Sequence, residues 1–184
     1  MLFLLFSACI IIFFLSCAST ARIRDDRPYI WLTDSSKYIL LSPENIETSM
    51  DNHQLISASY GGRDYQMNAW VRADETVIDI TLLNELGTIM GELVWHGGAV
   101  SFSSPVFPRS LNPAYIIADF QLCFYNGAAV ANALKEGGLS FEETETGRRI
   151  FNGNTVIIEI TKSQNRVRFV NHLRGYAYTL EGDF

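Results

Sequence analysis

Three histidines and a short run of serines are the side chains of this sequence best suited to catalysis or metal binding. His53, His96 and His172 lie far apart, and none has a second histidine four residues away, the spacing with which one helix face holds zinc. The serines within 101–104 lack the Gly-x-Ser-x-Gly turn that exposes a hydrolase nucleophile. We therefore expect a protein that is not an enzyme, with no metal site, no catalytic residue and no cofactor.

Two further candidates lie in a stretch with helical periodicity. Cys123 falls on its apolar side, where a thiol behaves as a small hydrophobic group. Asp119 lies between apolar residues of the same stretch, and a buried carboxylate there would need a polar partner. Arg109, Arg148 or Arg149 could supply it. Asp119 is then either a latch that holds a helical lid closed or an ordinary exposed carboxylate near a helix start.

The beginning of the chain predicts attachment to a membrane. Residues 1–16 hold no charged side chain and lead directly to Cys17, the pattern of a lipoprotein signal peptide that is cut before an acylated Cys17. Ala18 follows instead of the Asp that retains many Gram-negative lipoproteins in the inner membrane. The expected location is therefore the periplasmic face of the outer membrane. The alternative is an uncleaved segment anchored in the inner membrane, although about 17 apolar residues are the lower limit for spanning.

Composition restricts what the rest of the chain can do. All charged residues follow the signal, so the formal net charge of −6 belongs to the mature part. This part is acidic and has no Lys/Arg cluster beyond Arg22 to Arg27, which excludes nucleic-acid binding. Cys123 would be the one unmodified cysteine, which leaves no intrachain disulfide. We expect a tether over 17–36, whose apolar residues at 29–31 could dock on the domain, and a single domain over 37–184.

Alternation with a period of two dominates the domain. Apolar residues recur at every second position from Gln54 to Phe102, interrupted by Gly61-Gly62, by polar turns near 74 and 85, and by Gly97-Gly98. Strands separated by turns of this kind predict an antiparallel meander. A second β pattern runs from 139 to 180. Together they predict about ten to eleven strands.

Two short helices are expected between the two β regions. Asn112 followed by Pro113 is a helix start signal, and apolar residues then recur at helical spacing up to Phe124. A second, alanine-rich run over 128–135 ends at a pair of glycines. The predicted fold class is α+β: a curved antiparallel sheet, or half-barrel, whose apolar face is covered by two short lid helices.

The apolar side of this half-barrel either encloses a ligand or is fully packed. Large side chains at the rim, with Ala58, Ala69 and Gly91 on the sheet floor, would leave room for an acyl chain. Alternation and size select the candidate lining residues: Ile80, Leu82, Leu93, Trp95, Phe102, Phe120, Phe124, Ile158 and Phe169.

Two resemblances accompany this pattern. The segment TLLNELGT at 81–88, with GEL at 91–93 and the strand to Phe102, resembles the central hairpin of LolA and LolB, the carriers and receptors that move lipoproteins. IADFQL at 117–122, with Asn171 and GYAYTL at 175–180, is similar to a group of proteobacterial lipoproteins carrying domain of unknown function 3261. The resemblance implies a LolA/LolB-like half-barrel with a helical lid. It also implies an acyl or polyene lipid as cargo, since members of this group are associated with clusters that make such lipids.

The sequence therefore predicts an outer-membrane lipoprotein that binds or helps to transfer a hydrophobic, acyl or lipid-type ligand in the periplasm. It lacks a clear counterpart of the exposed apolar loop of the lipoprotein receptor and of the gating Arg of the carrier. A packed module that assembles with an envelope protein partner is the alternative. An enzyme acting on lipid-linked intermediates would require a close Asp and His pair.

Overall fold

The computed structural model describes residues 27–184, so the predictions for the signal peptide and for Cys17 lie outside the described residues. The elements in chain order are β1 (Tyr29–Trp31), β2 (Lys37–Ile39), a 3-10 turn η1 (Pro43–Asn45), β3 (Met50–Tyr60), β4 (Arg63–Ala73), β5 (Val77–Leu83), β6 (Ile89–His96), β7 (Ala99–Ser103), α2 (Ala114–Phe124), α3 (Gly127–Glu136), β8 (Ser140–Thr144), β9 (Gly147–Asn152), β10 (Thr155–Ser163), β11 (Arg166–Asn171) and β12 (Tyr176–Glu181).

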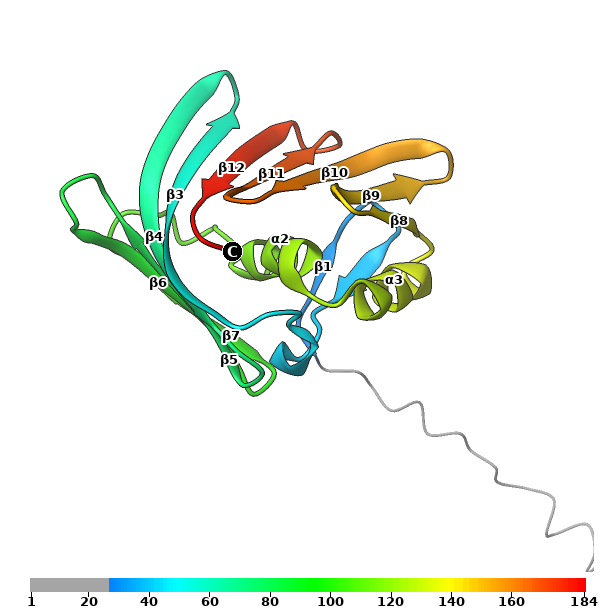
Figure 1. Ribbon diagram of the computed structural model, residues 1–184, viewed down its shortest axis with the longest axis horizontal. Coiled ribbons are helices and arrows are strands. Elements are labelled where there is room, and N and C mark those ends of the chain that lie inside the picture. The colour runs from blue at the N-terminus through cyan, green and yellow to red at the C-terminus, as the bar shows by residue number, and fades with distance from the viewer. Residues whose placement is uncertain (1–26) are drawn as a thin grey trace, which may run out of the picture.

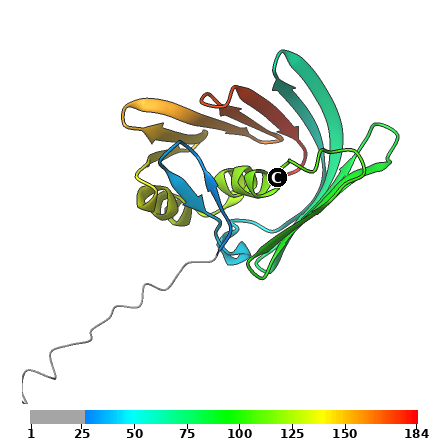
Figure 2. The same ribbon diagram turned by 180° about the vertical axis from the view of Figure 1, so that it is seen from behind.

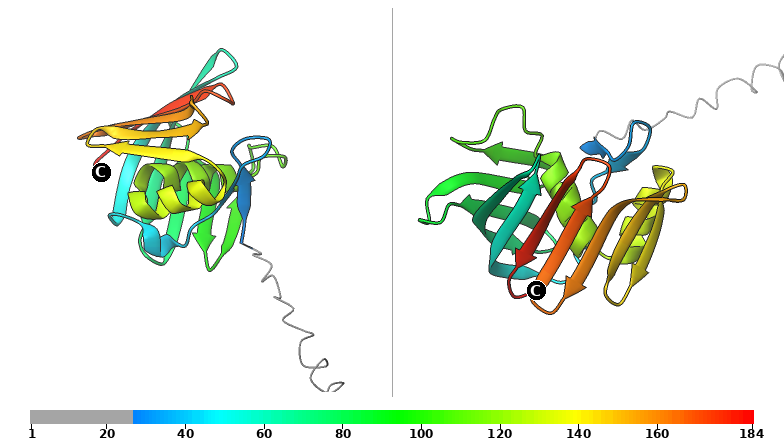
Figure 3. Two further views of the ribbon diagram at one scale, coloured as in Figure 1. Left: turned by 90° about the vertical axis from the view of Figure 1, so that its right-hand side faces the viewer. Right: turned by 90° about the horizontal axis from the view of Figure 1, so that it is seen from above.

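Ten antiparallel strands form one open, curved sheet that wraps around α2 (Figure 1). Their spatial order is β7-β6-β5-β4-β3-β12-β11-β10-β9-β8, which can be followed from above in Figure 3. Within each meander, β3–β7 and β8–β12, strands that are consecutive in the sequence pair with each other. The two meanders meet where β3 pairs with β12. Strands β7 and β8 are the free edges, so the sheet is not closed. The predicted α+β fold, a curved antiparallel half-barrel with two short helices, is confirmed.

Local sequence explains where the elements begin and bend. The Asn112 side chain accepts a hydrogen bond from the N–H of Ala114 at the start of α2, and Asn126 caps α3 by accepting from the N–H groups of Ala128 and Ala129. Register shifts follow Leu82 in β5 and Val156 in β10. Irregularities of this kind bend a strand, and they help the sheet to curve around the helix.

The concave face is packed. Eight of the nine candidate lining residues are buried, and Phe102 is half-buried. The room expected over Gly91 is occupied, since a Cβ added there would lie 3.0 Å from the Phe102 ring. Phe102 in turn packs against Phe107, with ring centroids 6.0 Å apart. Most of the predicted lining is therefore core, and any ligand site must lie where packing ends.

A small hairpin of β1 and β2 covers the remaining side, against α2 and α3 (Figure 2). Residues 29–31, which the sequence places in the tether, pair with β2. Ile30 and Tyr38 point into the core and are buried, while Tyr29 and Trp31 face outward. The folded part thus begins before residue 37. The sequence did not indicate this, because alternation over so few residues is too short to identify a strand.

Helices α2 and α3 have 11 and 10 residues. In the part of the chain that the structure describes, no helix has both the length and the apolar character needed to span a bilayer.

Candidate functional site

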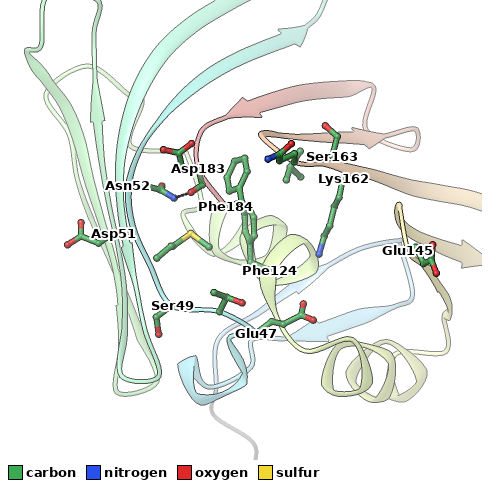
Figure 4. A pocket seen from close by; sticks show the side chains of 14 residues that line it. Glu47, Ser49, Asp51, Asn52, Phe124, Glu145, Lys162, Ser163, Asp183 and Phe184 are labelled. Carbon is green, nitrogen blue, oxygen red and sulfur yellow. Dashed lines mark hydrogen bonds between the residues drawn. The ribbon is translucent and has the colours of Figure 1, made fainter.

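A cavity of about 700 Å³ opens at one end of the half-barrel, between the start of β3, the end of α2 and the β10–β11 hairpin (Figure 4). The residues that follow β12 close it from a fourth side. Its walls are formed by Glu47, Thr48, Ser49, Met50, Asp51, Asn52, Phe124, Glu145, Lys162, Ser163, Gln164, Val167, Asp183 and Phe184. A volume of this size falls within the range of small-molecule sites.

Two stacked phenylalanines form the apolar wall. Phe124 is the C-terminal residue of α2, and its ring lies 5.4 Å from that of Phe184, with an angle of 26° between the ring planes. Phe120, one helical turn earlier, packs against Phe124 at 4.9 Å. Met50 and Val167 add apolar surface from β3 and β11. An aromatic wall of this kind suits an apolar chain or ring.

Charged groups face this wall. The side chain of Lys162, in β10, points into the cavity in the direction of Glu47 (Figure 4). Burial, followed by repulsion from Arg148, lowers the pKa of Lys162. At the opposite side, the Asn52 amide donates a hydrogen bond to the backbone carbonyl of Asp183 and so holds the segment that carries Phe184. The site combines an apolar wall with a polar edge, which suits an amphipathic molecule.

Arg148 is the buried charge that organises this end of the molecule. Its side chain is 1% exposed and donates to the carboxylates of Glu143 at 2.6 Å and Glu47 at 3.3 Å. It also donates to the carbonyl groups of Leu122 at 2.9 Å and Cys123 at 3.4 Å, in the last turn of α2. A guanidinium there satisfies carbonyls that have no partner within the helix and is stabilised by the negative end of the helix dipole. Arg148 therefore fixes the helix end that carries Phe124.

The loop before β3 supports the same helix end through its backbone. The N–H of Glu47 donates to the carbonyl of Phe124 at 3.0 Å, and the N–H of Asn126 donates to the carbonyl of Asn45 at 2.8 Å. Ile46 and Tyr125 form a β-bridge between these two bonds. Glu47 thus reaches the cavity from a segment that is hydrogen-bonded to α2.

The candidate ligand-lining residues separate into two groups. Phe124 lines the cavity, whereas the other eight belong to the core or pack against it. Those eight are Ile80, Leu82, Leu93, Trp95, Phe102, Phe120, Ile158 and Phe169. Trp95 additionally donates from its indole nitrogen to the carbonyl of Leu41 at 3.0 Å.

Asp119 is buried, but its partner differs from the arginines considered from sequence. The Tyr176 hydroxyl, on β12, donates to the Asp119 carboxyl group at 2.7 Å and thereby links α2 to the sheet. Burial raises the pKa of Asp119 to about 7, although the Tyr176 hydrogen bond and the nearby Arg174 act in the opposite direction. Arg148 instead binds the C-terminal end of α2, and Arg149 pairs with Glu159.

The remaining reactive side chains do not converge on the cavity. Cys123 is buried, and burial followed by the nearby Asp119 raises its pKa to about 12. All three histidines are exposed: His96 lies 3.0 Å from the carbonyl of Thr76, and His172 lies 3.9 Å from Glu159. Among residues 27–184, no three His, Cys, Asp or Glu side chains gather closely enough to hold a metal ion.

Sequence reasoning missed Lys162 and Phe184 as parts of this site, and it considered Arg148 only as a partner for Asp119. A sequence pattern indicates burial of Arg148, because it lies two positions before the apolar Ile150 and so shares one face of the strand with it. Both residues are buried in the structure. No local pattern indicates that Phe184 folds back onto α2, because it follows β12 and meets its partner only through the tertiary fold.

Comparison with known proteins adds one finding. None of the curated proteins matches this sequence. The family described as "Protein of unknown function (DUF3261)" matches residues 51–182, from β3 to the end of β12 and including both helices. The match covers most of the chain and nearly all of the curved sheet, and the chain therefore belongs to the DUF3261 family.

Proposed function

We propose that this protein is an outer-membrane lipoprotein, acylated at Cys17, that binds or helps to transfer a hydrophobic, acyl or lipid-type ligand in the periplasm without catalysing a reaction. The cavity of about 700 Å³ at the open end of the half-barrel carries the proposal. An acyl chain would lie against Phe124, Phe184 and Val167, and its polar end would face Lys162. The resemblance of the sequence to LolA and LolB, together with a curved sheet that wraps around α2, supports a carrier role by analogy.

The membrane anchor rests on the sequence before the folded domain. Residues 1–16 are free of charged side chains, and Cys17 precedes Ala18. Acyl chains on Cys17 would hold the domain at the periplasmic face of the outer membrane, since each buried methylene contributes about 0.8 kcal/mol. Retention of the apolar segment would instead anchor the domain in the inner membrane. In both arrangements the N-terminal segment holds the domain, and with it the cavity, beside a bilayer.

The direct test is the identity of what copurifies with the protein. The full chain, extracted from membranes with a mild detergent, is expected to release a stoichiometric acyl-type molecule on organic extraction and mass spectrometry. Bulk phospholipid in the proportions of the membrane, together with no uptake of a fluorescent fatty acid, would contradict ligand binding.

Replacing Phe184 by alanine is expected to weaken fluorescent fatty-acid binding about tenfold, because the lost ring contact corresponds to roughly 1.5 kcal/mol of apolar burial. Phe184 is 39% exposed, so its removal leaves the core intact. A fluorescence titration measures the change in dissociation constant.

Leu173→Ala is the matched control, since Leu173 is an exposed apolar residue, 55% accessible, in the β11–β12 turn and away from the cavity wall. This variant should bind as the unmodified protein does. Equal weakening in both variants would place the fatty acid elsewhere on the surface.

A packed envelope assembly module is the second candidate, and exposed apolar side chains favour it. Leu86 at the β5–β6 turn is almost fully exposed, and Ile89 and Val106 are exposed as well. The segment that carries Val106 is joined to β6, because the Ser104 hydroxyl donates to the carbonyl of Met90. Exposed apolar groups that lie near one another mark contact surfaces. Crosslinking in the native envelope separates the candidates: a stoichiometric protein partner captured at Leu86 would favour the module.

A further inference from the structure

Aromatic and basic side chains gather on the outer face of the β1–β2 hairpin and beside it. We call this surface the aromatic-basic face, and it consists of Tyr29, Trp31, Lys37, Tyr115 and Arg174. Tyr29 and Trp31 meet edge to face, with ring centroids 6.1 Å apart. The Lys37 ammonium lies 4.1 Å from the centre of the Tyr29 ring and 4.9 Å from that of Trp31.

Arg174 fixes the second half of this face. Its guanidinium lies 4.5 Å above the Tyr115 ring, donates to the Tyr115 hydroxyl at 3.0 Å and donates to the carbonyl of Trp31 at 2.7 Å. The hairpin, the start of α2 and the β11–β12 turn are thereby joined at the surface. The alternate hairpin residues Ile30 and Tyr38 are buried, so the outward rings are held on a rigid base.

The composition of this face matches a bilayer surface. Tryptophan and tyrosine concentrate at the level of lipid headgroups, where one part of the ring is in contact with acyl chains and the other with water. Lys37 and Arg174 are cations in a chain whose formal net charge is −6, and Asp34 is the one carboxylate within the hairpin from Tyr29 to Ile39. Anionic headgroups attract such cations, whereas they repel the acidic remainder of the domain.

The position of this face in the chain points to the same partner. Tyr29 begins β1, twelve residues after Cys17, and an extended chain of that length spans at most about 40 Å. A bilayer that holds the N-terminal segment therefore keeps the aromatic-basic face close to its surface. Tethering raises the effective concentration of the face at the membrane, so a weak interfacial contact is sufficient to orient the domain.

We infer that the aromatic-basic face lies against an anionic phospholipid surface and fixes the orientation of the domain on its tether. This inference rests on the proposed membrane anchor. Trp31 then lies at headgroup depth, whereas Trp70 remains in water. The two indoles are similarly accessible, 40% for Trp31 and 49% for Trp70, and Trp70 lies on the water-facing side of β4, where it donates to Asp51.

Tryptophan fluorescence of the full acylated chain tests this orientation. The chain is reconstituted in vesicles of phosphatidylethanolamine and phosphatidylglycerol whose acyl chains carry bromine near the headgroup. The Trp70→Phe variant retains Trp31 and the buried Trp95, and brominated lipid should quench roughly a third to a half of its emission, because one of its two indoles lies in the interface. The Trp31→Phe variant, which retains Trp70 and Trp95, should show almost no quenching.

Each other outcome contradicts the inference in a recognisable way. Sedimentation of both variants with vesicles but without selective quenching of Trp31 would overturn the orientation and leave the anchor intact. Equal quenching of both variants would show that no particular face is directed at the lipid. Failure of both variants to sediment with vesicles would overturn the anchor, and the orientation with it.

Discussion

Replacing Arg148 by methionine is expected to lower the free energy of unfolding by about 3 kcal/mol. Methionine retains an apolar stem but removes every donor of the guanidinium. The carboxylates of Glu47 and Glu143 are 55% and 40% exposed, so water can solvate them in the variant. The carbonyl groups of Leu122 and Cys123 are buried, and losing their donor accounts for most of the penalty. Chemical denaturation followed by circular dichroism measures the change.

Arg149 provides the control for this experiment. It is the next residue in β9, points to the opposite side of the sheet and forms an exposed ion pair with Glu159 at 3.3 Å. Exposed pairs contribute little, so Arg149→Met should leave the free energy of unfolding nearly unchanged. Similar losses in the two variants would show that Arg148 stabilises the protein through its positive charge alone and not through its hydrogen bonds to the end of α2. Arg148→Met should also weaken fatty-acid binding, because it releases the helix end that carries Phe124.

Asp119 is expected to make the protein less stable as the pH rises from about 4 to about 7. Burial raises the pKa of the folded carboxyl to about 7, whereas an aspartate in an unfolded chain titrates near 3.9. Between these two values the folded state retains a proton that the unfolded state releases. The stabilisation is therefore complete below about pH 4 and is lost as the pH approaches 7, by a total on the order of 4 kcal/mol.

The Asp119→Asn variant isolates this effect. The asparagine oxygen can still accept the hydrogen bond from Tyr176, but the side chain no longer titrates. The slope of stability against pH between 4 and 7 should become much shallower, and the variant should be the more stable protein at pH 8. Asp79→Asn, which alters a partly exposed carboxylate paired with Arg72, is the control and should retain the original slope. An unchanged slope in Asp119→Asn would assign the pH dependence to other groups.

Much of the fold is visible in the sequence because its signals are local. Alternation identifies the meander strands, since Ala69, Val71 and Ala73 all face the core from β4. Asn112 and Asn126 mark the helix starts through hydrogen bonds made within three residues. The pairing of β3 with β12 leaves no such signal, because these are the first and last strands of the ten-stranded sheet in chain order.

The site is less predictable than the fold for a related reason. Alternation shows which residues of a strand face inward, but not whether other side chains fill the space above them. Phe102 fills the space over Gly91, so the sheet floor is packed there. The cavity depends instead on how Phe184 meets Phe124 and on how Arg148 holds the end of α2. These contacts join residues that are distant in sequence, and no periodicity encodes them.

The junction between β3 and β12 also determines when the domain can finish folding. Ile56 of β3 pairs with Leu180 of β12 across this junction. A strand synthesised early can therefore complete its pairing only after β12 has been synthesised. Sheets joined by such distant pairs have high contact order and fold slowly, because a long loop must close before the pairing contributes stability. The growing polypeptide therefore cannot complete its sheet until β12 has been synthesised, and one edge of β3 lacks its partner strand until then.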